Sequence, residues 1–225
     1  MNRLDEAAIR YNTDKSSLYH RFTEYYDNWL KKYYNPTILE IGILDGNSIH
    51  MWNEYYKGKC TIYCVDIEDK SDILNNMDNV RFFQMDQGNW GQWDMFLRDT
   101  EGIQFDFILD DGSHFHEHQL LTLFKIYKKL KPGGVYILED LHTSFWSEWL
   151  KFPWGMSSSP LMFLNFLSEV PSVMNKYKDY ANEFIKDVKD IIIYNLRKKT
   201  DFYSGDNYPD ESHKRSVTGI LTFNN

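Results

Sequence analysis

Two apolar segments near the middle of the sequence each end in a pair of acids. Asp110 and Asp111 follow the first segment, and Glu139 and Asp140 follow the second, with a helical pattern between them. A β-α-β unit makes its two strands parallel, so both pairs are expected at the same edge of a sheet. Open α/β sheets bind ligands at that edge. Four carboxylates repel one another there, and a divalent cation that prefers oxygen ligands would stabilise them.

His114 lies three residues beyond the first pair of acids. Imidazole accepts a proton near neutral pH, so a histidine beside acids and a cation fits the removal of a proton from a hydroxyl group. A packing or helix-capping histidine is the alternative. His116 and His118 follow and are expected on the surface or behind the site. His142 follows the second pair of acids. A contact with the acceptor or the metal and the absence of such a contact are equally compatible with its position.

A glycine-containing turn is a second candidate binding element. An apolar strand starting at residue 37 runs to Glu40, Gly42 and Gly46, and a helical pattern follows over residues 49–56. Glycine lets a ligand approach the backbone, and a helix N-terminus offers free N–H groups. The Gly-x-x-x-Gly spacing lacks the tight turn of dinucleotide-binding enzymes. By itself the turn fits an ordinary strand-to-helix connection equally well.

Further polar side chains follow two more expected strands. Asp66 follows residues 61–65, and an acid about 20 residues beyond a glycine turn can accept hydrogen bonds from a ribose diol. Asp86 and Gln87 follow residues 80–85. Acids or glycines thus end all five strands expected up to residue 138, which predicts one continuous ligand-binding edge.

The order of the remaining elements indicates one α/β domain over residues 1–225. Further strands are expected at 105–109, 135–138, 191–196 and 216–223, with the last two forming an antiparallel hairpin. Helices are expected at 5–11, 18–33, 120–130, 161–170 and 173–188. Residues 1–35 would form a helical segment that could cover the sheet edge as a lid, although the aromatic stripe of 18–33 is most simply a packing face.

Composition argues against several classes of protein. The net charge of −8 disfavours nucleic acid as the main partner, and Lys125, Lys128, Lys129 and Lys131 are interpreted as a solvated helix face. No apolar run approaches the roughly 20 residues of a membrane span, and the N-terminus lacks a signal peptide, so a cytoplasmic location is expected. Cys60 and Cys64 are expected to be packed thiols.

An aromatic stretch follows His142. It contains Trp146 and two further tryptophans, and aromatic faces can stack on the C–H surfaces of a sugar. The stretch therefore fits a wall for a sugar-containing acceptor. A packed loop or a contact between the subunits of a homo-oligomer fits equally well.

At these positions the chain resembles the class I S-adenosylmethionine (SAM) methyltransferases. The matching residues are Glu40-Ile41-Gly42 with Gly46, Asp66, Asp86, Asp110 and the turn Lys131-Pro132-Gly133-Gly134. More narrowly, Thr13-Asp14-Lys15 and the segments 110–114 and 139–142 resemble the metal-dependent sugar O-methyltransferases of the macrocin and mycinamicin type. The resemblance covers most of residues 11–146.

The resemblance implies a fold, two cofactors and a set of site residues. The fold would be a Rossmann-like, seven-stranded, mostly parallel sheet with helices on both faces and a C-terminal antiparallel hairpin. SAM would contact Glu40, Gly42, Gly46, Ser48, Asp66, Ile67, Asp86, Gln87 and Asp110. Asp111, Glu139 and Asp140 would bind Mg²⁺ or Mn²⁺; Asp111 and His114 would be catalytic, His114 as the general base. Thr13, Lys15, His142 and Trp146 would border the acceptor.

The favoured function is metal-dependent transfer of a methyl group from SAM to a hydroxyl of a sugar. A nicotinamide-dependent oxidoreductase is the first alternative, and the glycine spacing argues against it. A non-catalytic scaffold with the same fold is the second, and the intact acids and His114 argue against it.

Overall fold

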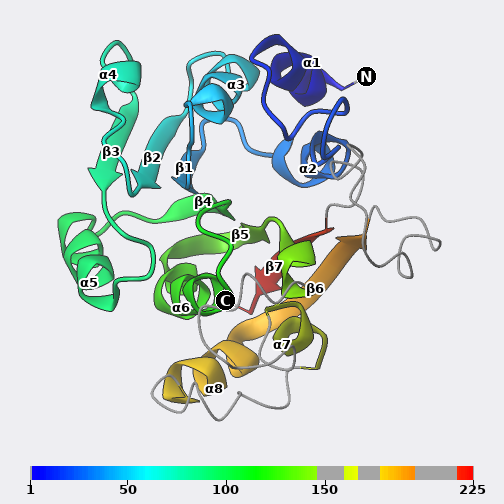
Figure 1. The fold of residues 1–225 in the computed structure, drawn as a ribbon, viewed down its shortest axis with the longest axis vertical. Helices are drawn as coiled ribbons and strands as arrows, with labels where there is room; N and C mark the ends of the chain where they lie inside the picture. The colour runs from blue at the N-terminus through cyan, green and yellow to red at the C-terminus, as the bar shows by residue number, and fades with distance from the viewer. Residues whose placement is uncertain (1, 146–159, 167–177, 196–216, 225) are drawn as a thin grey trace.

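The computed structural model describes residues 2–145, 160–166, 178–195 and 217–224. Within these residues, seven strands form one sheet in the order β3-β2-β1-β4-β5-β7-β6 (Figure 1). The strands are β1 Thr37–Ile41, β2 Thr61–Asp66, β3 Val80–Gln84, β4 Phe105–Asp110, β5 Leu130–Leu138, β6 Val188–Asn195 and β7 Val217–Phe223. β1 to β5 are parallel to one another, and β7 is antiparallel to both β5 and β6. The predicted parallel sheet and closing hairpin are confirmed.

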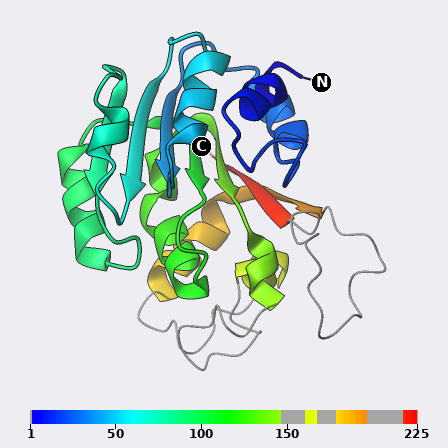
Figure 2. The same ribbon diagram turned by 45° about the horizontal axis from the view of Figure 1, so that its top comes forward.

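Helices cover both faces of this sheet (Figures 1 and 2). On one face lie α1 Arg3–Arg10, α2 Thr23–Leu30 and α3 Asn47–Tyr55. On the other lie α5 Trp90–Asp99, α6 His116–Ile126, α7 Pro160–Phe166 and α8 Lys178–Asp187. The short α4, Ser71–Leu74, precedes β3, and 3₁₀ turns cover Tyr127–Lys129 and Leu141–Phe145.

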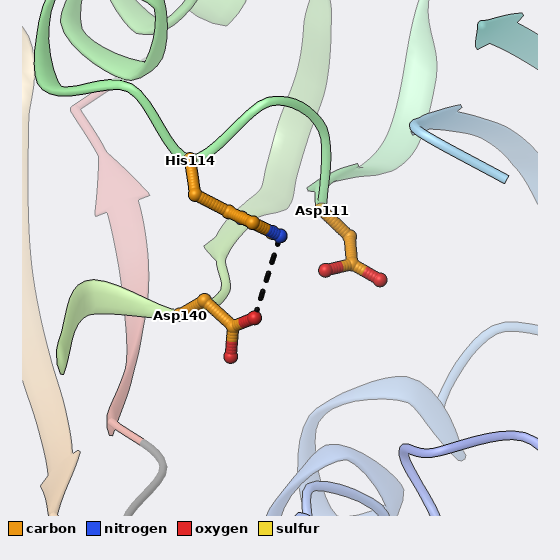
Figure 3. Close-up of side chains that lie close together, drawn as sticks. All are labelled: Asp111, His114 and Asp140. Carbon is orange, nitrogen blue, oxygen red and sulfur yellow. Dashed lines mark ion pairs between the residues drawn. The ribbon is translucent and has the colours of Figure 1, made fainter. Parts of the chain in front are cut away.

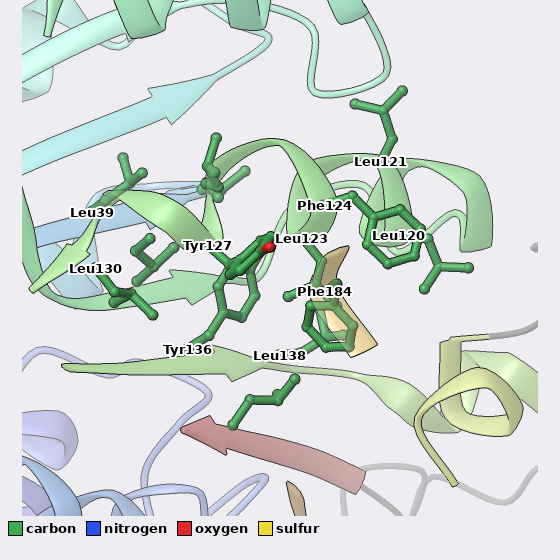
Figure 4. Packing of buried hydrophobic residues seen from close by; sticks show 14 of the residues in the cluster. Leu39, Leu120, Leu121, Leu123, Phe124, Tyr127, Leu130, Tyr136, Leu138 and Phe184 are labelled. Carbon is green, nitrogen blue, oxygen red and sulfur yellow. The ribbon is translucent and has the colours of Figure 1, made fainter. Parts of the chain in front are cut away.

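The core consists of two layers because successive strand residues point to opposite faces. In β1, Ile38 belongs to the layer under α1 to α3, whereas Leu39 belongs to the layer under α5 to α8. The second layer is drawn in Figure 4, where leucines and Phe124 of α6 meet Tyr136 and Leu138 of β5. The central strands β1, β4 and the second half of β5 are buried on both faces, so their carboxyl ends are held firmly at the site.

The N-terminal helices differ from the prediction at their boundaries, since α1 spans Arg3–Arg10 against the expected 5–11 and α2 ends at Leu30 against the expected 33. The helix expected at 18–33 begins only at Thr23, and Leu18 is 67% exposed. Arg21 has a left-handed backbone (φ 63°), which interrupts a right-handed helix. The aromatic stripe is a packing face as predicted, since Phe22 and Tyr26 are buried.

Two helices were not predicted from the sequence, and some boundaries differ from those expected. α5 is capped by Asn89, whose side chain accepts a hydrogen bond from the Gln92 N–H, a signal that the sequence contained. α4 is a single turn.

The helix expected at 120–130 begins at His116, and β5 starts at Leu130, before the expected 135. Helices α7 and α8 lie within the expected 161–170 and 173–188 apart from Pro160, but residues 167–177 lie outside the described ranges.

Two further side-chain predictions can be compared with the structure. Cys60 and Cys64 are free and buried, as predicted. The solvated-face interpretation is wrong for Lys125, whose ammonium pairs with Asp94 at 2.6 Å and lies 3.9 Å from the centre of the Trp90 ring. Its side chain is only 7% exposed, because the ring and the carboxylate replace water around the charge.

The structure gives two findings on solvent and membrane exposure. Among the described residues, no helix combines the length and apolarity needed to span a membrane. His116 and His118, expected on the surface or behind the site, are both buried, so of these two alternatives the structure fits the position behind the site. The cytoplasmic location stays a prediction.

Candidate active site

A cavity of about 510 Å³ lies at the carboxyl ends of β1 to β4. The loop after β5 also contributes to its wall. Cavities of this size commonly hold small-molecule ligands. The predicted site residues on its wall are Thr13, Lys15, Gly42, Ser48, Asp66, Ile67, Asp86, Gln87, Asp111, His114 and Asp140. Those not on its wall are Glu40, Gly46, Asp110, Glu139 and His142. Trp146 lies outside the described residues.

The glycine turn shapes the floor of the cavity. Gly42 has a φ of 78°, and a Cβ atom there would lie 2.2 Å from the backbone oxygen of Asp111. Only glycine therefore permits the loop after β4 to pack directly on the end of β1. Gly46, with a φ of 75°, is the left-handed residue immediately before α3.

Asp66 braces this turn. One carboxylate oxygen accepts hydrogen bonds from the backbone N–H groups of Ile43 (2.9 Å) and Leu44 (3.3 Å), and the other accepts from that of Glu68 (3.0 Å). A carboxylate has about four acceptor positions, so capacity remains for a ligand hydroxyl. The residue thus links β1 and β2 and also faces the cavity.

Two buried carboxyl groups lie behind the cavity wall. Glu40 accepts a hydrogen bond from the indole N–H of Trp52 at 2.8 Å. Asp110 accepts from the Gln87 amide at 2.7 Å and from the Tyr136 hydroxyl at 3.1 Å. Burial raises the pKa of each carboxyl to about 7, although these hydrogen bonds oppose the rise. The predicted contacts of Glu40 and Asp110 with a cofactor stay predictions.

Asp86 and Gln87 have structural contacts as well as positions on the wall. Asp86 accepts a hydrogen bond from the Gly88 N–H at 2.8 Å. The Gln87 carbonyl accepts from the Ser113 N–H at 2.8 Å, while its amide donates to Asp110. Gln87 therefore holds the loop that carries Asp111 and His114 against the end of β3.

Asp111, His114 and Asp140 converge on one point of the wall (Figure 3). One potential ligand atom from each lies within 4.8 Å of the others. His114 Nε2 is 3.4 Å from Asp140 Oδ2, and His142 Nδ1 is 3.6 Å from Asp140 Oδ1. Two β-strand ends supply the three side chains, as the sequence predicted for the acids. Two carboxylates and an imidazole suit a divalent cation.

The carboxylate of Glu139 makes other contacts. It accepts a hydrogen bond from the Tyr26 hydroxyl at 2.7 Å and pairs with the Lys15 ammonium at 3.0 Å. The same ammonium pairs with Asp111. Sequence reasoning gave Lys15 no defined role and did not consider Tyr26 as a site residue. The Thr13-Asp14-Lys15 resemblance was the one signal for Lys15, and none marked Tyr26.

The electrostatics of this group favour bound positive charge. Burial opposes the charge of Lys15, but the carboxylates of Asp111 and Glu139 outweigh it and raise the Lys15 pKa well above its usual range. Burial raises the pKa of both Glu139 and Asp140, and the Asp111 charge adds to each. One ammonium thus faces several acids, so a divalent cation would favour their ionised forms.

Comparison with known proteins identified one family and several relatives. Residues 39–141 match a family described as a methyltransferase domain. The mycinamicin VI 2''-O-methyltransferase of Micromonospora griseorubida is 33% identical over 152 residues, covering 64% of this chain and 37% of that protein. The demethylmacrocin O-methyltransferase of Streptomyces fradiae is 35% identical over 153 residues, with the same shares covered. The matched part therefore spans well under two thirds of these relatives.

Solved structures of a related fold were also found. The MycE methyltransferase of the mycinamycin biosynthetic pathway, in complex with Mg and SAH (crystal form 2), matches with a TM-score of 0.71 and 26% identity. That match covers 97% of this chain and 53% of the MycE chain. A MycE complex with Mg, SAH and mycinamycin VI matches with a TM-score of 0.73 and 24% identity over 99% and 54% of the two chains.

Proposed function

We propose that this chain, whose residues 39–141 match a methyltransferase domain, transfers a methyl group from SAM to a sugar hydroxyl with the help of a divalent cation. The observation that carries the proposal is the convergence of Asp111, His114 and Asp140 on the wall of the ligand cavity. The names of the relatives, which are O-methyltransferases, support the same reaction. MycE, which has the same fold, is named as a complex with Mg and SAH, in support of both cofactors.

The donor set fits Mg²⁺ or Mn²⁺. Asp111 and Asp140 would hold the cation, with His114 as their third neighbour, and Glu139 remains a predicted ligand. When bound, the cation would polarise the acceptor hydroxyl and orient its oxygen. The carboxylate oxygens of Asp111 and Asp140, with no thiolate in the group, favour these metals, whereas the His114 imidazole would suit zinc if it bound the metal.

The chain's own residues have separable tasks in this reaction. His114 would accept the hydroxyl proton, and the Asp140 carboxylate at 3.4 Å would orient the imidazole and stabilise it once protonated. Lys15 would offset the charge of Asp111 and Glu139. The cavity would hold the SAM methyl group in line with the acceptor oxygen, which is the positioning that such a transfer requires.

The acceptor and the organisation of the domain belong to the same proposal. Thr13 and Lys15 lie on the cavity wall, which supports a role for residues 1–35 as a cover over the site within one domain of residues 1–225. Contacts of Thr13, Lys15, His142 and Trp146 with a sugar-containing acceptor remain predictions. A homo-oligomer and the absence of a nucleic-acid partner also remain predictions.

Methyl transfer can be tested with SAM labelled in its methyl group, Mg²⁺ and a panel of glycosides. We expect label in glycosides and none in the matched aglycones, because only the glycosides carry sugar hydroxyls. Equal labelling of aglycones would contradict a sugar acceptor. Binding of NAD without binding of SAH would favour the oxidoreductase alternative, and SAH binding without transfer to any acceptor would favour a scaffold.

Cofactor binding at Asp66 gives a second expected result. Asp66→Asn should weaken SAH binding by about 1–3 kcal/mol, the value of a charge-assisted hydrogen bond, when affinity is measured by calorimetry. Asp106→Asn is the matched control, because Asp106 also accepts a backbone N–H, from Thr37 at 2.7 Å, but is not on the cavity wall. Unchanged SAH affinity in Asp66→Asn would remove this residue from the cofactor site.

The brace function of Asp66 requires one more comparison. Loss of its backbone hydrogen bonds could distort the turn without involving ribose. A 2′-deoxy analogue of SAH separates the two effects, because it lacks one ribose hydroxyl. We expect the preference for SAH over the analogue to shrink in Asp66→Asn, whereas equal loss for both ligands would indicate a brace alone.

A further inference from the structure

Two of the three converging residues, His114 and Asp140, have a backbone conformation that side chains rarely adopt. His114 has a φ of 57° and Asp140 a φ of 54°. Neither is glycine, so each position is strained and persists only where the surroundings hold it in place. The two residues lie in loops that follow different strands, β4 and β5, and their side chains meet at 3.4 Å. Whatever holds both backbones also determines how base and acid face each other.

One buried hydroxyl contacts both of these backbones. Thr143 Oγ1 is 2.9 Å from the carbonyl oxygen of Asp140 and 3.3 Å from that of His114. The contact with Asp140 is local and common for threonine in a helical turn, where the Thr143 N–H also donates to the same carbonyl at 3.0 Å. A hydroxyl has one proton and both carbonyls only accept, so the two contacts share it: the 2.9 Å contact with Asp140 is the stronger, and the 3.3 Å contact with His114, which spans 29 residues, is the weaker one that joins the two loops. Thr143 is only 2% exposed, so water does not replace these bonds readily.

Thr143 is itself held from α6. Its carbonyl oxygen lies 3.0 Å from Nε2 of the buried His116. Because a carbonyl oxygen only accepts, this nitrogen carries the proton and donates it. A third element thus supports the residue that contacts both strained loops.

We propose that Thr143 is a positioning residue, which sets the separation of His114 and Asp140 through its hydroxyl and is supported by His116. The inference rests on the proposed function for its catalytic consequence, but its structural content is independent of that function. Thr143 is not on the cavity wall and acts only through the two residues that are.

The test compares two variants. Thr143→Val removes the hydroxyl and keeps the side-chain shape, whereas Thr143→Ser keeps the hydroxyl and removes the methyl group. We expect kcat to fall about 10–10²-fold in Thr143→Val, because small displacements of reacting groups have effects of this size, with recovery in Thr143→Ser. SAH affinity should stay within about twofold, since no cofactor contact changes.

Thr100→Val is the matched control. Thr100 is also buried, its hydroxyl donates to the Phe96 carbonyl at 2.7 Å, and its carbonyl accepts from a side chain, Lys129. It follows α5 and is not on the cavity wall. Both valine variants should lose stability, but only Thr143→Val should lose kcat. An equal loss of kcat in both, or none in Thr143→Val, would overturn the proposal.

A readout without turnover keeps the inference separate from the proposed function. Amide hydrogen exchange at residues 112–115 should accelerate in Thr143→Val relative to Thr143→Ser and Thr100→Val, and a crystal structure should show a longer His114–Asp140 separation. Unchanged exchange and separation would refute the positioning role. Failure of the wild-type protein to methylate any glycoside would refute only the proposed function. If Thr143→Val does not fold, Thr143→Ala removes the same hydroxyl and is measured instead.

Discussion

Methyl transfer is expected to stop when a chelator removes divalent cations and to return when Mg²⁺ or Mn²⁺ is added. Burial raises the pKa of Asp140 and the Asp111 charge adds to the rise, although His114 opposes it, so a bound cation would favour the ionised carboxylates. Lewis-acid activation of a hydroxyl is worth several kcal/mol, which corresponds to at least about 10²-fold in turnover. A labelled-methyl assay across a chelator titration measures the effect.

Variants distinguish a metal site from a set of structural acids. Asp111→Asn and Asp140→Asn should reduce both turnover and Mn²⁺ affinity. Asp27→Asn, which changes an acid in α2 that accepts a hydrogen bond from Tyr55 at 2.8 Å, should alter neither. Full activity in excess chelator, with the acids intact, would place the chain among metal-independent methyltransferases.

Glu139 allows a sharper version of the same experiment. If Glu139 binds the metal as predicted, Glu139→Gln should lower Mn²⁺ affinity as much as Asp111→Asn does. Its observed contacts with Tyr26 and Lys15 support a different result, in which protein stability falls while metal affinity changes little. Calorimetric Mn²⁺ titration of the two variants decides between them.

Replacement of His114 by alanine should lower kcat by roughly 10²–10⁴ while SAH binding persists. This range is typical for loss of a general base, and His114 lies on the wall beside Asp140 but makes no contribution to the glycine turn. His50→Ala is the matched control, because His50 lies in α3, stacks on Tyr11 at 5.5 Å and is not on the wall. Single-turnover kinetics would measure the chemical step directly.

Two outcomes would change the role of His114. Near-normal turnover in His114→Ala would indicate that water or His142 accepts the proton instead. Nδ1 of His142 is 3.6 Å from Asp140. A large loss of Mn²⁺ affinity in the same variant would make His114 a metal ligand, in line with its place in the group of three. A base that does not bind the metal leaves Mn²⁺ affinity unchanged.

Local sequence patterns were sufficient to predict most of the sheet and its binding edge. Strand periodicity and glycine turns are set by residues close together in sequence. Parallel topology then places the acids at the strand ends along one edge of the sheet. For this reason Asp66, Asp111 and Asp140 could be assigned to one edge from the sequence alone, and all three lie on the wall of one cavity.

Tertiary packing decided which atoms those residues contact. No local pattern shows that Lys15 and Tyr26, more than 100 residues away in sequence, would engage Glu139, because burial of an ion pair depends on how α2 and the preceding segment pack on the sheet. The late start of α2 and the burial of Lys125 have the same origin, as tertiary contacts override helix propensity and charge pattern.

The left-handed backbones of His114 and Asp140 and their link through Thr143 are also decided by tertiary structure. Sequence alone predicted an acid-rich edge and assigned Asp66, Asp111 and Asp140 to it, but it did not separate these from Glu40, Asp110 and Glu139, which lie behind the cavity wall. The distances within that edge depend on strained loops from two strands, and only contacts between distant segments can hold such strain.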